Sequence, residues 1–330
     1  MKTKIISSIV LLVIIFSGFA YYHARQLPNQ MTSAITETFV VKRGASFSTA
    51  AKALEEQGVI KNAFLFKLLA KKRQQDHLLK SGEYNLQKSV SLGDLLTKLT
   101  DGDVIIHSVT LIDGWTFQNF RTHLAKQELL VINTDEMTNE QIMDAIGAPK
   151  TNPEGQFAPD TYQFQKGDSD LDILKRSFKR QQELVDLAWQ NRQPSPHIKT
   201  KEEALTLASI IEKETGQGGE RAEISGVFYN RLRIGMKLQT DPTVIYGMGK
   251  LYKGNIKRVH LRTDTPYNTY TRYGLPPTPI AMPGKASITA ALNPKKTKSL
   301  YFVGKGDGTH YFSKNLAEHN RAVTKYQLGR

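Results

Sequence analysis

The stretch LTLASIIEKETG, Leu205 to Gly216, decides the fold of the C-terminal half of this chain, because it predicts a buried helix that ends in a carboxylate. Thr200, with Glu203 three residues later, is a capping-box start, and Gly216 is a natural left-handed stop. The positions at helical spacing before Glu214 are all apolar: Ile211, Leu207 and Ala204. Glu214 therefore belongs to the core-facing side of the helix.

Two features of Glu214 raise the expected pKa of its carboxyl group. The residue shares an apolar face, and it lies in the last turn, where the helix dipole disfavours negative charge. Both effects favour the protonated form near neutral pH, which is the form that a general acid needs. On pattern alone, a Glu in a final helical turn is more often a solvated end residue. The segments that follow favour the acid.

Two longer segments follow this helix, ERAEISGVFYNRLRIGMKLQTDPTVIYGMG from Glu220 to Gly249 and TPYNTYTRYGLPPTPIAMPG from Thr265 to Gly284. Together with ASIIEKETG they resemble the endolytic murein transglycosylases, the YceG-like family. The resemblance covers the whole chain and is most specific between Ala208 and Gly249. It implies a single-pass inner-membrane enzyme that cuts nascent peptidoglycan glycan strands. The second Glu of its EKET motif, Glu214, is then the catalytic residue, which is the residue that the helical face selects independently.

The chemistry that this resemblance implies needs one carboxyl group and no cofactor. The acid protonates the glycosidic oxygen between MurNAc and GlcNAc. The same residue, now a base, deprotonates the MurNAc C6 hydroxyl, which closes onto C1 to give a 1,6-anhydro end without consuming water. Two alternatives remain open. A muramidase-type hydrolase would use a second carboxylate, and a non-catalytic wall-binding scaffold would recruit the peptidoglycan synthesis machinery. The intact EKETG motif favours the enzyme.

Candidate substrate contacts lie in the segments around Glu214. Asp241 precedes Pro242, a pair typical of a helix N-cap with Pro at the first helical position. Gln239 and Asp241 are also placed to line a cleft beside Glu214, and both roles can hold at once. The resemblance adds Tyr246 as a helper.

A loop rich in Pro and Gly carries a cluster of Tyr and Asn that suits sugar binding, because aromatic faces stack on pyranose rings and amides bond hydroxyl groups. We expect Tyr270 to contact substrate there, and the resemblance selects Asn268 as a second contact. Packing within the loop is the alternative. The segment PEGQFAPDTYQF, Pro153 to Phe164, matches the EG…PDTY pattern of the family and adds Glu154 and Asp160.

Other polar residues are given structural roles. Arg231, on a helix expected from Glu223 to Leu232, is predicted to form an ion pair. His260 and His310 are isolated from each other and from acidic pairs at ligand spacing, so no metal site is predicted.

The composition restricts the class of protein. At 330 residues and 39% hydrophobic content, the chain suits an anchor plus two folded regions. It has no cysteine, which excludes disulfides, Cys-based metal sites and a lipid anchor through an N-terminal Cys. The net charge of +14 is dispersed and accompanies no nucleic-acid motif. This charge suits attraction to an anionic membrane leaflet and to wall polymers, and a solvated basic surface is the alternative that charge alone leaves open. Nucleic acid is not an expected partner, and peptidoglycan synthases are partners suggested by the family resemblance.

The N-terminal stretch from Ile5 to Tyr22 has no charge and would span roughly 27 Å as a helix, enough for a hydrocarbon core. Lys2 and Lys4 precede it and favour a cytoplasmic N-terminus. A cleaved signal peptide is the alternative, with a small-x-small site at residues 18–20. The resemblance favours a retained anchor at residues 5–22 and a periplasmic catalytic domain.

An internal repeat follows the anchor. Phe39 to Gln57 aligns without gaps on Val109 to Gln127, at an offset of 70 residues. The strand–helix–helix–strand order within residues 37–135 resembles a LysM-like module, which binds the GlcNAc backbone in cell walls. A packing unit that only holds the catalytic domain away from the membrane is the alternative. The predicted fold class is thus α+β, with a transmembrane helix, a small LysM-like α/β region and a mixed α+β catalytic domain at residues 150–330.

Overall fold

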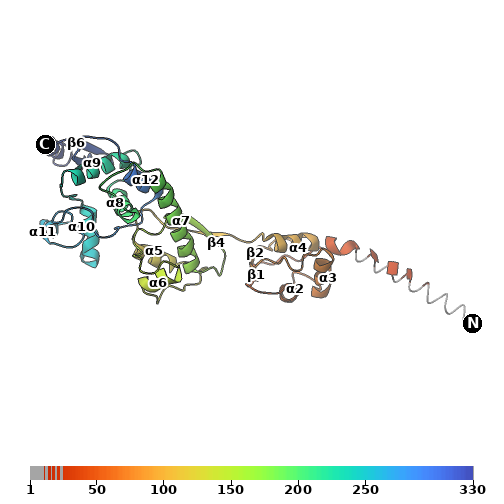
Figure 1. Cartoon of the computed structure of the whole chain (residues 1–330). Helices are drawn as coiled ribbons and strands as arrows, with labels where there is room; N and C mark the ends of the chain where they lie inside the picture. The colour runs from red at the N-terminus through yellow and green to blue at the C-terminus, as the bar shows by residue number, and fades with distance from the viewer. Residues whose placement is uncertain (1–10, 12–13, 16, 19–20, 23–24, 330) are drawn as a thin grey trace, which may run out of the picture. The chain divides into compact units, whose positions relative to one another are not determined.

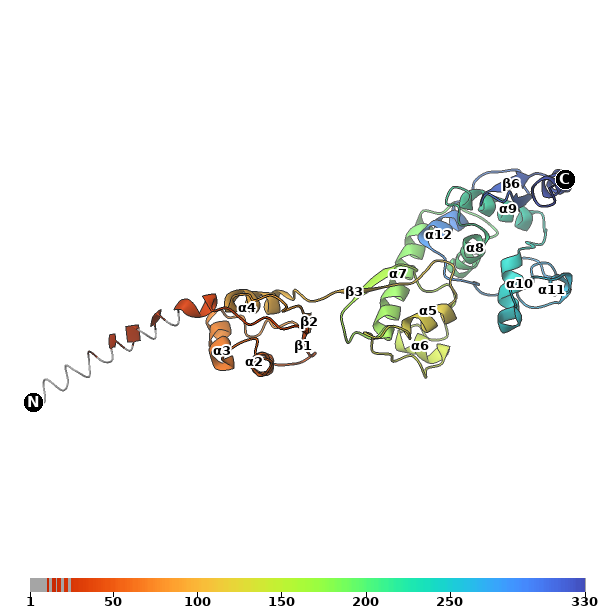
Figure 2. The same ribbon diagram turned by 180° about the vertical axis from the view of Figure 1, so that it is seen from behind.

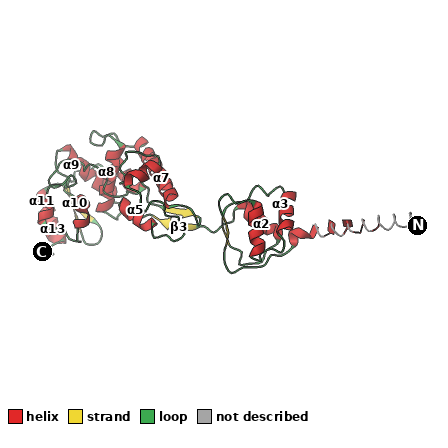
Figure 3. Ribbon diagram, turned by 90° about the horizontal axis from the view of Figure 1, so that it is seen from below, coloured by secondary structure: helices red, strands yellow, loops and turns green. Residues whose placement is uncertain are grey.

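The computed structural model describes residues 11, 14–15, 17–18, 21–22 and 25–329, and it is a mixed α+β structure (Figure 1). The chain forms two compact units. The N-terminal unit comprises Met1–His107 and Phe164–Gly167, and the C-terminal unit comprises Ser108–Gln163 and Asp168–Arg330. Helices predominate over strands (Figure 3). Within the described residues, the strands form three two-stranded sheets.

The N-terminal unit has the predicted order of strand, two helices and strand. Its elements are η1 (Leu27–Asn29), β1 (Phe39–Val41), α2 (Phe47–Glu56), α3 (Ala63–Lys72), β2 (Gly82–Tyr84) and α4 (Leu92–Asp101). Strands β1 and β2 are antiparallel, with Phe39 opposite Tyr84. Both side chains are fully buried and pack with α2, α3 and α4 in one apolar core. The likeness of this unit to a LysM module stays a prediction.

Local capping explains where these helices begin. The side chains of Ser46, Asn62 and Ser91 each accept a hydrogen bond from a backbone N–H in the first turn of α2, α3 and α4, respectively. Such caps satisfy donors that have no partner within the helix.

The predicted anchor at residues 5–22 falls largely outside the described residues. Of its described positions, Leu11, Ile14 and Ile15 carry exposed apolar side chains. Among the helices that the structure describes, none has the length and apolar character needed to cross a bilayer.

The C-terminal unit is built mainly from helices. Its elements are β3 (His107–Thr110), α5 (Phe117–Leu124), α6 (Asn139–Ala145), β4 (Thr161–Phe164), α7 (Asp170–Gln190), α8 (Lys201–Glu214), α9 (Arg221–Arg233), α10 (Asp241–Met248), η2 (Gly249–Leu251), α11 (Arg258–Arg262), α12 (Lys285–Leu292), β5 (Tyr301–Gly304), β6 (His310–Ser313) and α13 (Leu316–Tyr326). Helix α8 packs against α12, α9, α10 and α7, as the two opposite views show (Figures 1 and 2). Its buried residues form the centre of the apolar core.

The two units divide at a different place from the predicted regions, which ended at residue 135 and began at residue 150. The second copy of the repeat lies in the C-terminal unit, because α5 packs there. The ring of Phe117 on α5 stacks on the ring of Phe157, with 4.9 Å between the centroids. The backbone N–H of Phe117 donates to the carboxylate of Glu154. These contacts join the second copy to the predicted catalytic domain.

The start of α8 confirms the predicted capping box. The Thr200 hydroxyl accepts from the N–H of Glu203 at 3.1 Å, and the Glu203 carboxylate accepts from the N–H of Thr200 at 3.1 Å. The predicted left-handed stop at Gly216 is wrong. The helix ends at Glu214 because Thr215 is extended, with φ −145°, and its hydroxyl accepts from the N–H of Gln217.

Candidate active site

Glu214 lies at the C-terminal end of α8, where its partly buried side chain faces a cavity of about 520 Å³. Helices α9, α10 and α13, strands β5 and β6 and the loop before α10 supply the other walls. The polar and aromatic residues of this cavity, called the acid cavity below, are Arg231, Gln239, Asp241, Tyr270, Tyr301, Phe302, His310, His319, Asn320 and Gln327. Of the predicted substrate contacts, Gln239, Asp241 and Tyr270 lie in it.

The surroundings of Glu214 raise the pKa of its carboxyl group above 4.5, as predicted. Burial is the largest cause, and the nearby charge of Asp241 acts in the same direction. The hydrogen bond from Thr240 and the charge of Arg231, together with that of His310 when its ring is protonated, oppose these effects without cancelling them. The Thr240 hydroxyl donates to Oε1 of Glu214. The site therefore favours a protonated carboxyl group beside an open cavity.

The backbone at Gln239 is strained, because its φ of +47° lies in the left-handed region that residues other than glycine rarely adopt. Thr269 holds this conformation. Its carbonyl accepts from the N–H of Gln239 at 3.1 Å, and its hydroxyl accepts from the N–H of Thr240 at 3.0 Å. The strained turn thereby directs the Thr240 hydroxyl at Glu214.

Asp241 was predicted as the N-cap of α10, but the cap is Thr240 and Asp241 is the first helical residue. The physical reason is the backbone: Thr240 is extended, with φ −115° and ψ 124°, and the helical conformation begins at Asp241. The Thr240 hydroxyl makes no capping hydrogen bond because it bonds to Glu214. The Asp241 carboxylate accepts from the hydroxyl of Tyr270 at 2.6 Å. Burial and this bond to Asp241 raise the pKa of Tyr270. A second carboxylate and a tyrosine thus face the acid cavity as a bonded pair.

Arg231 does not form the predicted ion pair with any described residue. Its guanidinium donates to the carbonyls of Leu300, at 2.7 Å, and Leu238. It also lies over the ring of Tyr301, 5.4 Å from the centroid. Arg231 is buried on the wall of the same cavity as Glu214, and its positive charge lowers the pKa of that carboxyl group.

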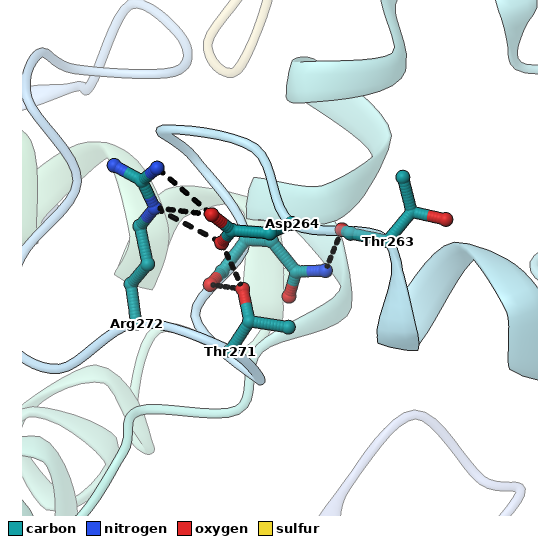
Figure 4. Close-up of polar contacts among 5 residues, drawn as sticks. Thr263, Asp264, Thr271 and Arg272 are labelled. Atoms are coloured by element: carbon teal, nitrogen blue, oxygen red, sulfur yellow. Dashed lines mark hydrogen bonds and ion pairs between the residues drawn. The ribbon is translucent and has the colours of Figure 1, made fainter.

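Asn268, predicted as a substrate contact, is only 1% exposed and bonds within its own loop. Its side-chain amide donates to three backbone carbonyls, of His260, Leu261 and Thr263, and its Oδ1 accepts from the N–H of Tyr270. In the same loop, Asp264 pairs with Arg272 at 2.9 Å and accepts from Thr271 (Figure 4). Asn268 fixes the loop that presents Tyr270.

Glu154 and Tyr246 lie in a second cavity, of about 910 Å³, with Asn152, Tyr252 and Tyr267 among its walls. The Glu154 carboxylate is 6% exposed and accepts from the N–H of Phe117 at 3.0 Å and the hydroxyl of Tyr246 at 3.1 Å. Burial raises the pKa of Glu154 to about 7. Helix α10 contributes Asp241 to the acid cavity and Tyr246 to this second one. Asp160 lies in neither cavity.

Glu212, two residues before Glu214, has a different role. Its side chain is 6% exposed, pairs with Arg221 at 3.2 Å and accepts from the N–H of Gly284 at 2.9 Å. It does not line the acid cavity. The helical spacing thus separates a carboxylate that holds the fold from one that faces the cavity.

His310 is the main residue that the sequence did not indicate. It lines the acid cavity and pairs with Glu220, 90 residues away, at 2.7 Å. No local pattern could have indicated a partner so distant along the chain. In the part of the chain that the structure describes, no group of three His, Cys, Asp or Glu residues could hold a metal ion.

A protonated carboxyl group facing a cavity with tyrosines and a second carboxylate is the site of an acid catalyst for polar polymers such as glycans. The YceG-like family model matches residues 39–325, and this chain belongs to that family.

The chain is similar to two endolytic murein transglycosylases. It is 34% identical to the protein from Bacillus subtilis, over 95% of this chain and 91% of that protein. It is 28% identical to the one from Streptococcus pneumoniae serotype 2, over 98% of this chain but only 65% of that protein. The structure also resembles a crystal structure of a YceG-like protein from Listeria monocytogenes. The TM-score is 0.53 at 31% identity, covering 86% of this chain and 97% of that one.

Proposed function

We propose that this chain is an endolytic murein transglycosylase that cleaves the bond between MurNAc and GlcNAc in nascent glycan strands. The reaction is non-hydrolytic and leaves 1,6-anhydroMurNAc ends. The observation that carries the proposal is Glu214, an acid with a raised pKa on the wall of a cavity. Two relatives that align along almost the whole of this chain and carry that name support it.

The first step of this reaction is proton transfer from Glu214 to the glycosidic oxygen. Because Oε1 accepts from Thr240, Oε2 is the oxygen left to carry the proton toward substrate. Positioning such a donor typically contributes 10²–10⁴-fold to the rate. Tyr270 and Tyr301 line the same cavity and would contact the sugars there.

The second step is attack on C1. As the bond from C1 to the leaving oxygen breaks, C1 gains positive charge, and the carboxylate of Asp241 is placed to stabilise it. The C6 hydroxyl oxygen then forms the bond to C1 and gives up its proton to a base on the wall of the cavity. The presence of a second carboxylate, Asp241, in the same cavity also favours an alternative, a muramidase-type hydrolase. In that mechanism Asp241 would form a covalent intermediate or activate water.

The products separate these candidates. Purified glycan strands are incubated with the enzyme, digested, and analysed by mass spectrometry. We expect 1,6-anhydro ends from the wild type and none from Glu214→Gln. Reducing ends would identify a hydrolase, and an absence of products would identify a wall-binding scaffold.

The setting of the reaction is part of the proposal. Residues 5–22, which carry no charge, would anchor the chain in the inner membrane with the N-terminus in the cytoplasm and the remainder in the periplasm. The N-terminal unit would act as a LysM-like region that contacts the glycan backbone. An anchored enzyme meets strands as synthases polymerise them, so we propose that cleavage terminates strand elongation beside peptidoglycan synthases.

A further inference from the structure

His310 and Glu220 form a close pair beside the acid cavity. His310 is the first residue of β6, and Glu220 immediately precedes α9. The ring Nδ1 lies 2.7 Å from Oε2 of Glu220, and the backbone N–H of His310 donates to Oε1 at 2.9 Å. The two side chains are only 14% and 19% exposed. One carboxylate therefore holds both the backbone and the ring of His310.

The pair is oriented toward the cavity that contains Glu214. His310 lines the acid cavity, whereas Glu220 does not. Because Nδ1 faces Glu220, the other ring nitrogen, Nε2, is the one available to the cavity. Among the described residues, Nε2 has no hydrogen-bond partner. The ring of Phe302 meets the imidazole edge to face, at 5.4 Å and 87°, and limits its rotation.

This arrangement selects one tautomer of the imidazole. A carboxylate that accepts from Nδ1–H leaves the lone pair on Nε2 and makes that nitrogen a better proton acceptor. The same logic operates where a carboxylate orients the histidine of a catalytic triad. The other titratable or charged groups on this cavity are Glu214, Arg231, Asp241, Tyr270, Tyr301 and His319. The cavity thus presents a proton donor, Glu214, and a proton acceptor, His310, to the same ligand.

We propose that His310 is the base of the reaction, with Glu220 as its positioning residue; this inference rests on the transglycosylase function proposed above. Nε2 takes the proton of the MurNAc C6 hydroxyl while its oxygen forms the bond to C1. Glu214 gives its proton to the glycosidic oxygen, which leaves with the electron pair of the broken bond. The step ends with a Glu214 carboxylate and a His310 imidazolium. Solvent returns the proton to Glu214, so no co-reactant is consumed.

The shape of the pH profile distinguishes this division of labour from a mechanism in which Glu214 performs both steps. In a mechanism in which Glu214 performs both steps, kcat/KM has an alkaline limb from Glu214, and any acid limb comes from groups other than His310, such as the Asp241 carboxylate on the same cavity, and persists in His310→Asn. A neutral His310 adds an acid limb, because activity is lost as falling pH protonates Nε2.

The experiment compares the full-length wild type with His310→Asn and Glu220→Gln, measuring the rate of anhydro-end formation from pH 4 to pH 9. We expect His310→Asn to lower kcat/KM at neutral pH by about 10²–10⁴-fold and to lose the acid limb. Glu220→Gln, which removes the charged acceptor that orients the ring, should lower kcat by a smaller factor and leave KM unchanged. His123→Asn, another partly buried histidine that lies in neither cavity, is the control and should match the wild type.

A wild-type rate for His310→Asn, or an equal loss at every pH with the wild-type profile shape, would overturn the role of His310. The second result would indicate a structural role only. If His310→Asn does not fold by circular dichroism, the kinetics of Glu220→Gln decide, and a wild-type kcat for that variant overturns the proposal. Failure of the proposed function is separate, since the wild type would then form no anhydro ends.

Discussion

The hydroxyl of Thr240 donates a hydrogen bond to Oε1 of Glu214, which ties the acid to the strained turn before α10. This bond stabilises the carboxylate form and lowers the pKa of Glu214 against the larger effect of burial. Thr240 therefore limits how high that pKa rises.

Replacing Thr240 tests this balance. In Thr240→Val the carboxylate loses its donor, so the pKa of Glu214 rises and the alkaline limb of kcat/KM moves to higher pH. Thr240→Ser keeps the hydroxyl and should retain the wild-type limb. The rate of anhydro-end formation, measured across pH for each variant, gives the position of its alkaline limb. A limb that stays in place in Thr240→Val would show that this bond does not set the acidity.

The wild-type alkaline limb itself is a prediction. The acid must be protonated, so activity falls as pH rises through the pKa of Glu214, which burial raises above the ordinary 4.5. We expect the midpoint well above that value. A midpoint near 4.5 in the pH dependence of kcat/KM would contradict the argument from burial.

The two glutamates of the EKET motif should respond differently to the same change. Glu214→Gln should fold normally and lose essentially all cleavage, because an amide cannot donate the catalytic proton. Glu212→Gln should keep most of its activity but lose about 1–3 kcal/mol of stability, since its buried partner Arg221 loses a charged acceptor. Cleavage assays measure the activity of the two variants, and thermal unfolding measures their stability. Exchanged phenotypes would mean that the wrong glutamate faces the cavity.

Glu154 should make the stability of the C-terminal unit depend on pH. Its pKa of about 7 in the folded protein exceeds the ordinary 4.5, so the folded state binds the extra proton. Stability should fall as pH rises from about 4.5 to about 7, by roughly 3 kcal/mol from this group. The free energy of unfolding of Glu154→Gln, measured with denaturant at each pH, should not show this part of the decrease. If the free energy of unfolding fell by the same amount between pH 4.5 and about pH 7 in the variant and the wild type, the role of Glu154 would be refuted.

The anchor is tested by topology. The purified full-length chain should keep its first residues and need detergent. A truncated chain that begins at Thr32 should be soluble and still cut isolated strands. In cells, the same truncated chain, secreted without its anchor, should act poorly on nascent strands, because tethering supplies the local concentration. N-terminal sequencing that finds a mature chain beginning at Tyr21 would identify a cleaved signal peptide instead.

Features that depend on local spacing could be predicted from the sequence. The capping box at Thr200 and the apolar face that carries Glu214 follow from helical periodicity, and both are present. The exact end of α8 could not be predicted, because the helix ends at the extended residue Thr215, one position before the glycine that was expected to end it.

Most of the acid cavity depends on long-range contacts, which a single sequence does not show. Arg231 bonds a carbonyl 69 residues away, and His310 meets a carboxylate 90 residues away. Asn268 was assigned to substrate because the family resemblance selected it from a loop rich in polar and aromatic residues. Pattern alone does not say that backbone carbonyls within the loop already use its amide.

Helix α10 has the acid cavity at its first residue, Asp241, and the second cavity at Ile245 and Tyr246. A ligand that occupies both must follow the helix, which is about 12 Å long. A single sugar ring is too short, whereas several linked rings are not. The length of the helix would then set the minimum length of the glycan that fills both cavities. The enzyme would therefore favour the interior of a long strand over short fragments.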